Sequence, residues 1–344
     1  MVDESAPAEI GPAEGAAPAS QAVERRPSAP LPPGFIHRRV VVDVPASTAN
    51  LGAGYDTLAM ALDLRDRIEV EVVDSPGLEL SVEGEGAGVL PASHDNRFIV
   101  ALDTGLRWAL GQVPPEIGFR VHMANAIPLA RGLGSSAAAT VAGLVAANAL
   151  TGDGLDQRRL LTLCIEIEGH PDNAAAALLG GFVVIALVDG RPETVRFDAP
   201  RDLRAVLFVP DLQLPTSEMR AALPREVPHR DAVFNLGRVA LAVAGLASGR
   251  YDVLRAGTED RLHEPYRAQA YPALPKLIAA ARAAGAIGAC LSGSGSTVLA
   301  FGASMSVLTA IGAAFMATAA EAGLGGSVRI VSPRNAGAVV IEAD

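Results

Sequence analysis

The sequence predicts an α+β protein with two domains. The chain has 344 residues, half of them hydrophobic, and strand-like and helix-like segments interleave along most of it. This length exceeds that of one average domain, and such interleaving is typical of mixed α and β folds. We expect a disordered tail at residues 1–36, a first domain at residues 37–190 and a second at residues 191–344.

The tail prediction rests on composition. Residues 1–36 are rich in Ala, Pro, Glu and Ser and contain few large apolar side chains. Burial of so few side chains does not offset the entropy lost on ordering the chain. We interpret the segment as a dispensable extension, with a docking or regulatory role as the alternative.

The predicted first domain contains strands and helices with distinct hydrophobic periods. Alternating or continuous apolar residues predict strands at residues 38–44, 67–73, 78–82, 118–127 and 182–188. Good helix formers and amphipathic spacing predict helices at residues 96–110, 136–150 and 156–167, and another that begins at Pro171 and stops at Gly180 and Gly181.

The predicted second domain follows a turn at residues 189–192, where we place the domain boundary. Strands are expected at residues 205–209, 297–301, 328–331 and 338–341, and another is expected to end at Leu291. Helices are expected directly after Thr216 and at residues 231–246, 274–284 and 305–322.

Charge and composition exclude several classes of partner. The net charge is −10 and the pI is about 5.1, whereas nucleic acids and anionic membranes require basic surfaces. Cys164 and Cys290 lie in apolar surroundings without CxxC spacing, which predicts buried, reduced thiols. No long apolar run or signal-peptide pattern stands out, so we expect a soluble cytoplasmic protein.

The most informative stretch, which we call the cradle loop, joins the strand at residues 118–127 to the helix at residues 136–150. It consists of Pro128, Leu129, Ala130, Arg131, Gly132, Leu133, Gly134, Ser135, Ser136, Ala137 and Ala138. The first turn of a helix has unpaired N–H groups and the positive end of the helix dipole, so it binds anions. Glycines let the backbone approach an anion closely, and the two serines are expected to cap the helix or reach a metal on the phosphates. The sequence therefore predicts a phosphate site.

One residue count restricts the class of phosphate site. Lys276 is the only lysine in the chain. A P-loop of the GxxxxGK[ST] kind is therefore impossible, because its lysine contacts the phosphates.

Three other segments carry polar residues that turns alone do not require. The first polar loop, residues 45–56, contains Asn50 and Asp56. A glycine-marked break between two helices contains Glu168 and His170, before Asp172 and Asn173 at a helix start. The Gly/Ser loop, residues 292–297, joins two strands. Asn, Asp, Gly and Ser are ordinary turn and capping residues, so each segment alone also has a purely structural interpretation. A zinc site is not indicated, because neither cysteine is nearby and no HxxxH spacing occurs.

Taken together, these loops resemble the GHMP kinase superfamily. The cradle loop is similar to that family's PxxxGLGSSAA motif. The first polar loop lies before it and the Gly/Ser loop after it, in the same order as in the family. The resemblance covers residues 38–344 and implies the two-domain GHMP kinase fold. In that fold an N-terminal domain like domain 2 of ribosomal protein S5 precedes a C-terminal ferredoxin-like α/β sandwich.

Within this superfamily, the details look like the homoserine kinases. The similar segments are residues 44–56, 168–173, 209–220 and 260–267. The resemblance implies transfer of the ATP γ-phosphate to the side-chain hydroxyl of L-homoserine, giving O-phospho-L-homoserine on the route to threonine. Mevalonate-type relatives carry a lysine-bearing segment that this chain lacks.

The resemblance also implies roles for individual residues. It places ATP on the cradle loop and Mg²⁺ on Ser136 and Glu168, and it makes Glu168 and Asn173 the catalytic residues. The implied substrate-binding residues are Asn50, Asp56, His170, Asn173, Thr216, Arg220 and Arg267. Arg220 and Arg267 match a clamp for the substrate carboxylate, to which guanidinium groups are suited, and Asp56 with Asn50 matches the group that holds the ammonium.

Some alternatives stay open at this point. We expect no dedicated general base, because a loose phosphoryl-transfer transition state needs little activation of the nucleophile, but Asp172 stands beside the position where some relatives have one. A kinase for another small alcohol, or a non-catalytic sensor that binds ATP and a small molecule, are the rival functions. A homodimer is common in the family and is expected here.

Overall fold

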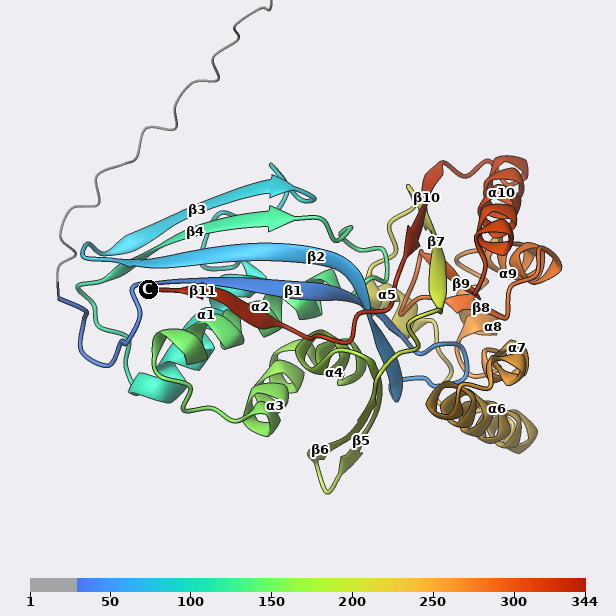
Figure 1. The fold of residues 1–344 in the computed structure, drawn as a ribbon, viewed down its shortest axis with the longest axis horizontal. Coiled ribbons are helices and arrows are strands. Elements are labelled where there is room, and N and C mark those ends of the chain that lie inside the picture. Colours follow the sequence, from blue (N-terminus) through green and yellow to red (C-terminus); the bar gives the residue numbers. More distant parts are fainter. Residues whose placement is uncertain (1–29) are drawn as a thin grey trace, which may run out of the picture. The chain divides into compact units, whose positions relative to one another are not determined.

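The computed structural model describes residues 30–344, and Figure 1 shows their arrangement. Two sheets organise these residues. The larger sheet has the strand order β11-β1-β2-β4-β3, with β5 attached to β2 and β6 to β5. Its strands are β1 (Arg39–Ala49), β2 (Leu58–Val73), β3 (Gly77–Gly84), β4 (Gly118–Asn125), β5 (Phe182–Val188), β6 (Arg191–Phe197) and β11 (Val339–Ala343).

Four helices cover one face of the larger sheet (Figure 1). They are α1 (Arg97–Leu110), α2 (Ser135–Leu150), α3 (Gln157–Glu168) and α4 (Asp172–Leu179). The helix that follows the cradle loop, α2, is buried along most of its length. Its small residues let α1 come very close: a Cβ on Gly143 would lie 2.4 Å from the carbonyl oxygen of Phe98. This close packing fixes the helix whose first turn faces the site.

The smaller sheet has the order β10-β7-β9-β8 and is antiparallel throughout. Its strands are β7 (Arg204–Pro210), β8 (Gly288–Leu291), β9 (Val298–Gly302) and β10 (Gly326–Val331). Its helices are α5 (Thr216–Ala221), α6 (His229–Ser248), α7 (Leu254–Gly257), α8 (Glu264–Arg267), α9 (Leu274–Ala283) and α10 (Met305–Glu321), with a 3-10 turn at Tyr251–Val253. Strands in the order fourth, first, third and second, with helices after the first and third, form the expected ferredoxin-like arrangement.

Most of the predicted elements are confirmed, with boundaries that shift by a few residues. Two predicted strands were too short and one strand was missed. The strand predicted at residues 38–44 continues to Ala49 as β1 and so includes the start of the first polar loop. The strand predicted at residues 67–73 begins already at Leu58, because residues 58–62 are buried on both faces and show no alternation. The segment 191–197 was assigned no strand, yet it forms β6, since Asp189 and Gly190 adopt positive φ and close a hairpin with β5.

The domain boundary at residues 190 and 191 stays a prediction. Strand pairing adds that β6 and β11, which both follow this boundary in sequence, belong to the larger sheet. Of the predicted N-terminal tail, residues 1–29 lie outside the described residues. The prediction extends too far at its end, because Phe35 is 6% exposed in the main core and the N–H of Ile36 donates to the carbonyl of Leu150 at 2.8 Å.

Other predictions concern the cysteines and membrane segments. Cys164 and Cys290 are buried and free, as expected. Within residues 30–344, α6 alone is long and apolar enough to cross a membrane. Length and composition alone do not establish a membrane span, and Asn235 of α6 is buried and hydrogen bonded to Asp260 at 2.7 Å.

A buried carboxylate supports the strand that leads into the cradle loop. Oδ1 of Asp66 in β2 accepts the N–H groups of Ala126 and Ile127 at 2.7 and 3.0 Å, and the residue is 2% exposed. Burial raises the pKa of Asp66 to about 6, which the two N–H donors oppose.

This raised pKa predicts a stability effect with a definite sign. The folded state binds the Asp66 proton more tightly than the unfolded state, so this group costs stability as the pH rises from about 4 to about 6. The Asp66→Asn variant keeps an oxygen acceptor for both N–H groups and carries no charge. We expect its free energy of unfolding at pH 8 to exceed that of the wild type by about 1 to 3 kcal/mol, and the gain to shrink towards pH 4.

Urea denaturation of both proteins at several pH values measures this difference. The exposed Glu116 provides a control, since Glu116→Gln removes a charge without a buried acceptor. An Asp66→Asn variant that is less stable than the wild type at pH 8 would contradict the interpretation.

Candidate active site

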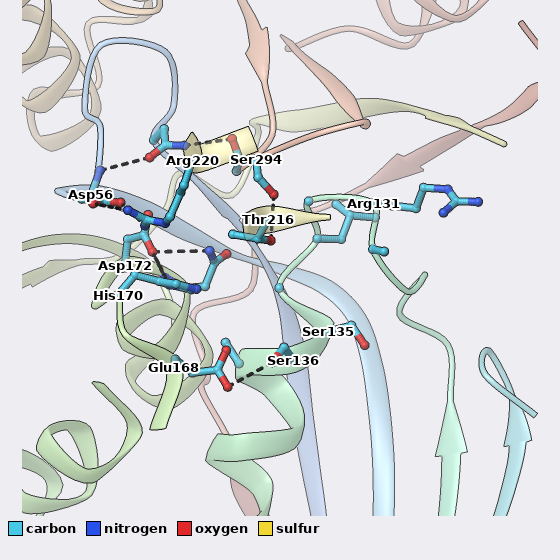
Figure 2. Close-up of a pocket in the computed structure, with 18 of the residues that line it drawn as sticks. Asp56, Arg131, Ser135, Ser136, Glu168, His170, Asp172, Thr216, Arg220 and Ser294 are labelled. Atoms are coloured by element: carbon cyan, nitrogen blue, oxygen red, sulfur yellow. Dashed lines mark hydrogen bonds and ion pairs between the residues drawn. The ribbon is translucent and has the colours of Figure 1, made fainter. Parts of the chain in front are cut away.

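One pocket gathers nearly all of the site residues that the sequence predicts, and Figure 2 shows how they face one another. It lies between the cradle loop, the first polar loop, the break between α3 and α4, and the segments around α5, α8 and the Gly/Ser loop. The predicted residues that line it outside the cradle loop are Asn50, Asp56, Glu168, His170, Asn173, Thr216, Arg220 and Arg267. Within the cradle loop, Leu129 and Ala138 do not line it, because Ala138 is fully buried in the core and Leu129 lines a neighbouring cavity.

The cradle loop presents backbone to the pocket. Gly132 and Gly134 have φ values of 72° and 71°, which only glycine adopts readily. Gly134 is the N-cap of α2, and no side-chain capping bond forms. The N–H groups of the first helical turn therefore stay available to an anion. The expectation that Ser135 and Ser136 cap the helix was wrong, because both residues lie inside its first turn.

Neighbouring loops hold the cradle loop by direct backbone contact. The carbonyl of Gly132 accepts the Ser292 hydroxyl at 2.7 Å, and the N–H of Thr297 donates to the carbonyl of Arg131 at 3.0 Å. A Cβ on Gly132 would lie 2.1 Å from the carbonyl oxygen of Ser292, and a Cβ on Gly134 would lie 2.1 Å from the hydroxyl of Ser47. The two glycines thus serve the contact between loops as well as the open anion site.

The cation of the cradle loop is directed away from the pocket. The guanidinium of Arg131 donates to the backbone carbonyls of Leu129, Pro210 and Asp211 at 3.1, 2.7 and 2.9 Å, and its side chain points away from the labelled polar groups in Figure 2. Arg131 therefore contributes backbone to the pocket, and its charge ties the loop to the end of β7.

Glu168 at the end of α3 lies beside the first turn of α2. Its Oε1 accepts the Ser136 hydroxyl at 3.0 Å and the Thr140 hydroxyl at 2.6 Å, and its side chain is 3% exposed. Gly169, in a left-handed conformation, ends α3 directly after this carboxylate. A hydroxyl and a carboxylate next to an uncapped helix N-terminus suit Mg²⁺, which takes one or two protein oxygens and completes its shell with phosphate and water. Within residues 30–344, no cluster of three or more His, Cys, Asp or Glu side chains is placed to hold a metal without such help.

The start of α4 carries a second polar cluster. Oδ1 of Asp172 accepts the N–H of Asn173 at 2.7 Å and lies 3.2 Å from Nδ1 of His170. Burial lowers the pKa of His170, but the hydrogen bond and the charge of Asp172 outweigh burial and leave the pKa raised. Oδ1 of Asn173 accepts the Ser47 hydroxyl at 2.9 Å, which fixes the amide next to the cradle loop.

Asp56 and Arg220 form a bidentate ion pair across the pocket. Nη2 and Nη1 of Arg220 lie 2.7 and 3.0 Å from the two carboxylate oxygens of Asp56, and Nη1 also donates to the Tyr55 hydroxyl at 2.9 Å. The hydrogen bonds that Arg220 donates to Asp56 raise the pKa of Arg220 further, against the effect of burial. Asn50 supports this loop, since its Oδ1 accepts the N–H of Asp56 at 3.0 Å and its Nδ2 donates to the carbonyl of Gly293 at 2.9 Å.

Arg267 of α8 is held in a different way. Its Nη1 donates to the carbonyl of Gly293 at 3.0 Å and lies 3.1 Å from Nδ1 of His263, and the residue is 2% exposed. Nε2 of His263 faces the carbonyl of Gly52 at 2.7 Å and must donate to it, so Nδ1 is the acceptor for Arg267 and the imidazole is neutral. Burial lowers the pKa of His263, in agreement with this neutral form, and burial also lowers the pKa of Arg267.

The Gly/Ser loop reaches the pocket through Gly293 and Ser294. The hydroxyls of Ser294 and Thr216 lie 3.1 Å apart, so Thr216 at the start of α5 is tied to this loop.

Sequence reasoning missed several side chains that support the predicted ones. Thr140 follows Ser136 by one helical turn, and that spacing was a usable signal. Ser47, Tyr55 and His263 lie within the segments quoted for the family resemblance, but nothing in their local pattern distinguishes them from ordinary turn and core residues.

Comparison with known proteins identifies the relatives of this chain. Residues 98–181 match the family described as GHMP kinases N terminal domain, and residues 242–328 match GHMP kinases C terminal. A homoserine kinase of Moorella thermoacetica is 42% identical over 304 residues, covering 88% of this chain and 99% of that protein. One of Corynebacterium efficiens is 46% identical over 271 residues, covering 77% and 86%.

Solved structures agree with these matches. A crystal structure of homoserine kinase from Cytophaga hutchinsonii has a TM-score of 0.79 and 30% identity, covering 89% of this chain and 98% of that one. The mevalonate kinase of L. major in complex with R-mevalonate has a TM-score of 0.62 at 18% identity, covering 87% and 97%, which shows a shared fold alone.

The close contact at Gly134 generates a prediction. Gly134→Ala places a methyl group against the Ser47 hydroxyl and also strains a left-handed backbone. Gly190 has a similar φ of 74° with nothing within 4 Å of its Cβ position, so Gly190→Ala measures the backbone strain alone. We expect the Gly190 variant to lose about 1 kcal/mol of stability and the Gly134 variant at least about 1 kcal/mol more, measured by urea denaturation. Equal losses would show that the contact with Ser47 carries no constraint.

Proposed function

Because the chain belongs to the GHMP kinases, and among them to the homoserine kinases, we propose that it transfers the γ-phosphate of ATP to the side-chain hydroxyl of L-homoserine. The products are ADP and O-phospho-L-homoserine, an intermediate of threonine biosynthesis. One observation carries the proposal for this site. The pocket brings the open N-terminus of α2 and the carboxylate of Glu168 together with the guanidinium groups of Arg220 and Arg267 and the carboxylate of Asp56. The two guanidinium groups suit the carboxylate end of an amino acid, and Asp56 suits its ammonium end.

The nucleotide phosphates are assigned to the cradle loop. Its free N–H groups at the start of α2 supply donors without any lysine. A second cavity shares Pro128 and Arg131 with the pocket and is also lined by Gly86, Val89 and Leu129. We assign the base of ATP to this cavity, which gives Leu129 its role in binding the nucleotide.

Mg²⁺ is assigned to Ser136 and Glu168. When bound, the ion neutralises charge on the phosphate oxygens and orients them for transfer. The protein's part is to hold the carboxylate in place, and Thr140 does so through its 2.6 Å hydrogen bond to Oε1 of Glu168.

The amino-acid substrate is assigned to the opposite side of the pocket. Arg220 and Arg267 receive its carboxylate and Asp56 its ammonium group, whereas Asn50 positions Asp56 because both ends of its amide are already bonded. His170, Asn173 and Thr216 surround the remaining space, with Asn173 at the reacting hydroxyl.

The chemical step needs orientation more than a base. The hydroxyl oxygen forms a bond to the γ-phosphorus, the bond from that phosphorus to the bridging oxygen of ADP breaks, and the hydroxyl proton passes to a phosphate oxygen or to water. We assign no base role to Asp172, because its Oδ1 is already engaged by Asn173 and His170 and a loose transition state requires little activation of the nucleophile.

Two rival functions have weaker support. A kinase for another small alcohol would not need two guanidinium groups beside the carboxylate of Asp56 in its pocket. The one lysine, Lys276, lies at a different cavity with Leu212 and Tyr271. A sensor without catalysis would not need the Ser136 and Glu168 pair beside the anion site. A cytoplasmic location and a homodimer remain predictions.

The experiment that tests the function is a coupled assay of ADP release with a panel of acceptors. We expect turnover with L-homoserine that requires both ATP and Mg²⁺, and much weaker turnover with mevalonate or a sugar. Preference for another acceptor would overturn the substrate assignment, and nucleotide binding without turnover of any acceptor would favour the sensor.

The assignment of Glu168 yields a separate prediction. Glu168→Gln keeps an oxygen acceptor for Ser136 and Thr140 but removes the negative charge, so we expect kcat to fall about a hundredfold or more with little change in the KM for homoserine. The exposed Glu166 on the same helix gives the control, since Glu166→Gln makes the same chemical change outside the pocket. Normal turnover by the Glu168 variant would remove the metal assignment.

A further inference from the structure

We infer that the ion pair between Asp56 and Arg220 selects zwitterionic acceptors, because an acceptor that engages only one member of the pair leaves the other without a partner. The inference rests on the proposed function and deepens it. It makes recognition of the ammonium group and recognition of the carboxylate depend on each other.

The two residues assigned to opposite ends of the substrate are already bonded to each other. Both carboxylate oxygens of Asp56 face Arg220, at 2.7 and 3.0 Å, and Figure 2 shows the pair at the pocket wall. Their side chains are 31% and 35% exposed, so the pair is reachable from the pocket yet partly shielded from water. A substrate that uses both groups must separate them.

Arg220 is free to move and Arg267 is not. Within residues 30–344, the side-chain hydrogen bonds of Arg220 all go to side chains of the first polar loop, namely Asp56 and the Tyr55 hydroxyl. Arg267 is anchored by the carbonyls of Gly293 and Met219 and by His263, and it is almost fully buried. One guanidinium is therefore fixed, and the other can exchange Asp56 for a substrate carboxylate.

Tyr55 provides a surface between the two guanidinium groups. The Cζ atoms of Arg220 and Arg267 each lie 5.6 Å from the centre of its ring. Such contacts stabilise a cation without fixing its direction. Arg220 can then turn from Asp56 towards a carboxylate held by Arg267 and keep contact with the ring.

The charges show why both ends of the acceptor are needed. A zwitterion replaces one internal pair with two pairs, ammonium to Asp56 and carboxylate to Arg220. An acceptor with a carboxylate alone draws Arg220 away and leaves Asp56 partly buried without a partner, and an acceptor with an ammonium alone does the same to Arg220. An uncompensated charge in a partly buried site is costly.

Two analogues of homoserine separate these cases. 4-Hydroxybutyrate keeps the hydroxyl and the carboxylate and lacks the ammonium, whereas 3-amino-1-propanol keeps the hydroxyl and the ammonium and lacks the carboxylate.

The Asp56→Asn variant no longer holds Arg220 in an ion pair. We expect kcat/KM for 4-hydroxybutyrate to rise about five- to tenfold over the wild type, while kcat/KM for homoserine falls by at least about that factor.

The reciprocal variant gives an independent arm. Arg220→Gln releases Asp56, so we expect kcat/KM for 3-amino-1-propanol to rise about five- to tenfold and that for homoserine to fall. The pair formed by Asp103 and Arg107 on the surface of α1 supplies the control, because Asp103→Asn makes the same change far from the pocket and should alter none of the three acceptors. Should one variant fail to fold by thermal denaturation, the other arm decides.

The outcomes separate the inference from the function. Wild-type turnover of homoserine with a gain in either arm supports both. Suppose that the wild type turns over homoserine, but kcat/KM for each analogue in its folded variant is equal to or below the wild-type value. This result overturns the exchange and leaves the kinase assignment intact. Absence of wild-type turnover with homoserine overturns the proposed function itself.

Discussion

Close contact between the backbone of the cradle loop and its neighbours is the constraint on which the rest of the site depends. Gly132 and Gly134 lie where any side chain would collide with Ser292 or Ser47. Through these contacts the start of α2 is joined to the Gly/Ser loop of the smaller sheet and to β1 of the larger sheet. The carbonyl of Gly293 extends the same junction, because it accepts from both Asn50 and Arg267. The residues assigned to the phosphates and to the acceptor thus belong to one continuous set of loops.

The proposed function requires an acidic protein with a single lysine to bind a polyanion. The net charge of −10 opposes any long-range attraction of ATP. Arg131 of the cradle loop is engaged by backbone carbonyls, Arg97 lies 3.6 Å from Glu168, and Arg220 and Arg267 are assigned to the acceptor. In the proposed function, the phosphates are therefore bound mainly by peptide dipoles at short range and by Mg²⁺, and Arg220 and Arg267 bind the acceptor.

Local sequence signals predicted much of the fold and the cradle loop, whereas most of the other site residues came from the family resemblance. Amphipathic helices such as α1 and α3 and the alternating half of β2 follow directly from side-chain periodicity. The strand at residues 58–62 was not predicted, because a strand buried on both faces has no alternation. Strand β6 was not predicted, because Arg191 and Pro192 look like part of a turn. Most of the residues predicted for the site do line one pocket, but the hydrogen-bond partners of their side chains were not predicted. Whether Arg220 faces a ligand or Asp56, and whether His263 packs in the core or orients Arg267, depends on contacts between segments far apart in sequence.

The pairing of β11 with β1 has a consequence for how this protein is made. The chain leaves the larger sheet after β6, builds the smaller sheet, and returns through β11, with Asn335 and Ala199 tying the two crossing segments together by a pair of hydrogen bonds. The N–H of Arg38 donates to the carbonyl of Asp344 at 2.9 Å beside this strand. During translation β1 emerges early, but its edge stays open until the last strand of the sheet leaves the ribosome. The larger sheet is therefore completed only after synthesis has passed residue 343, so a prematurely terminated chain exposes a strand edge that invites aggregation.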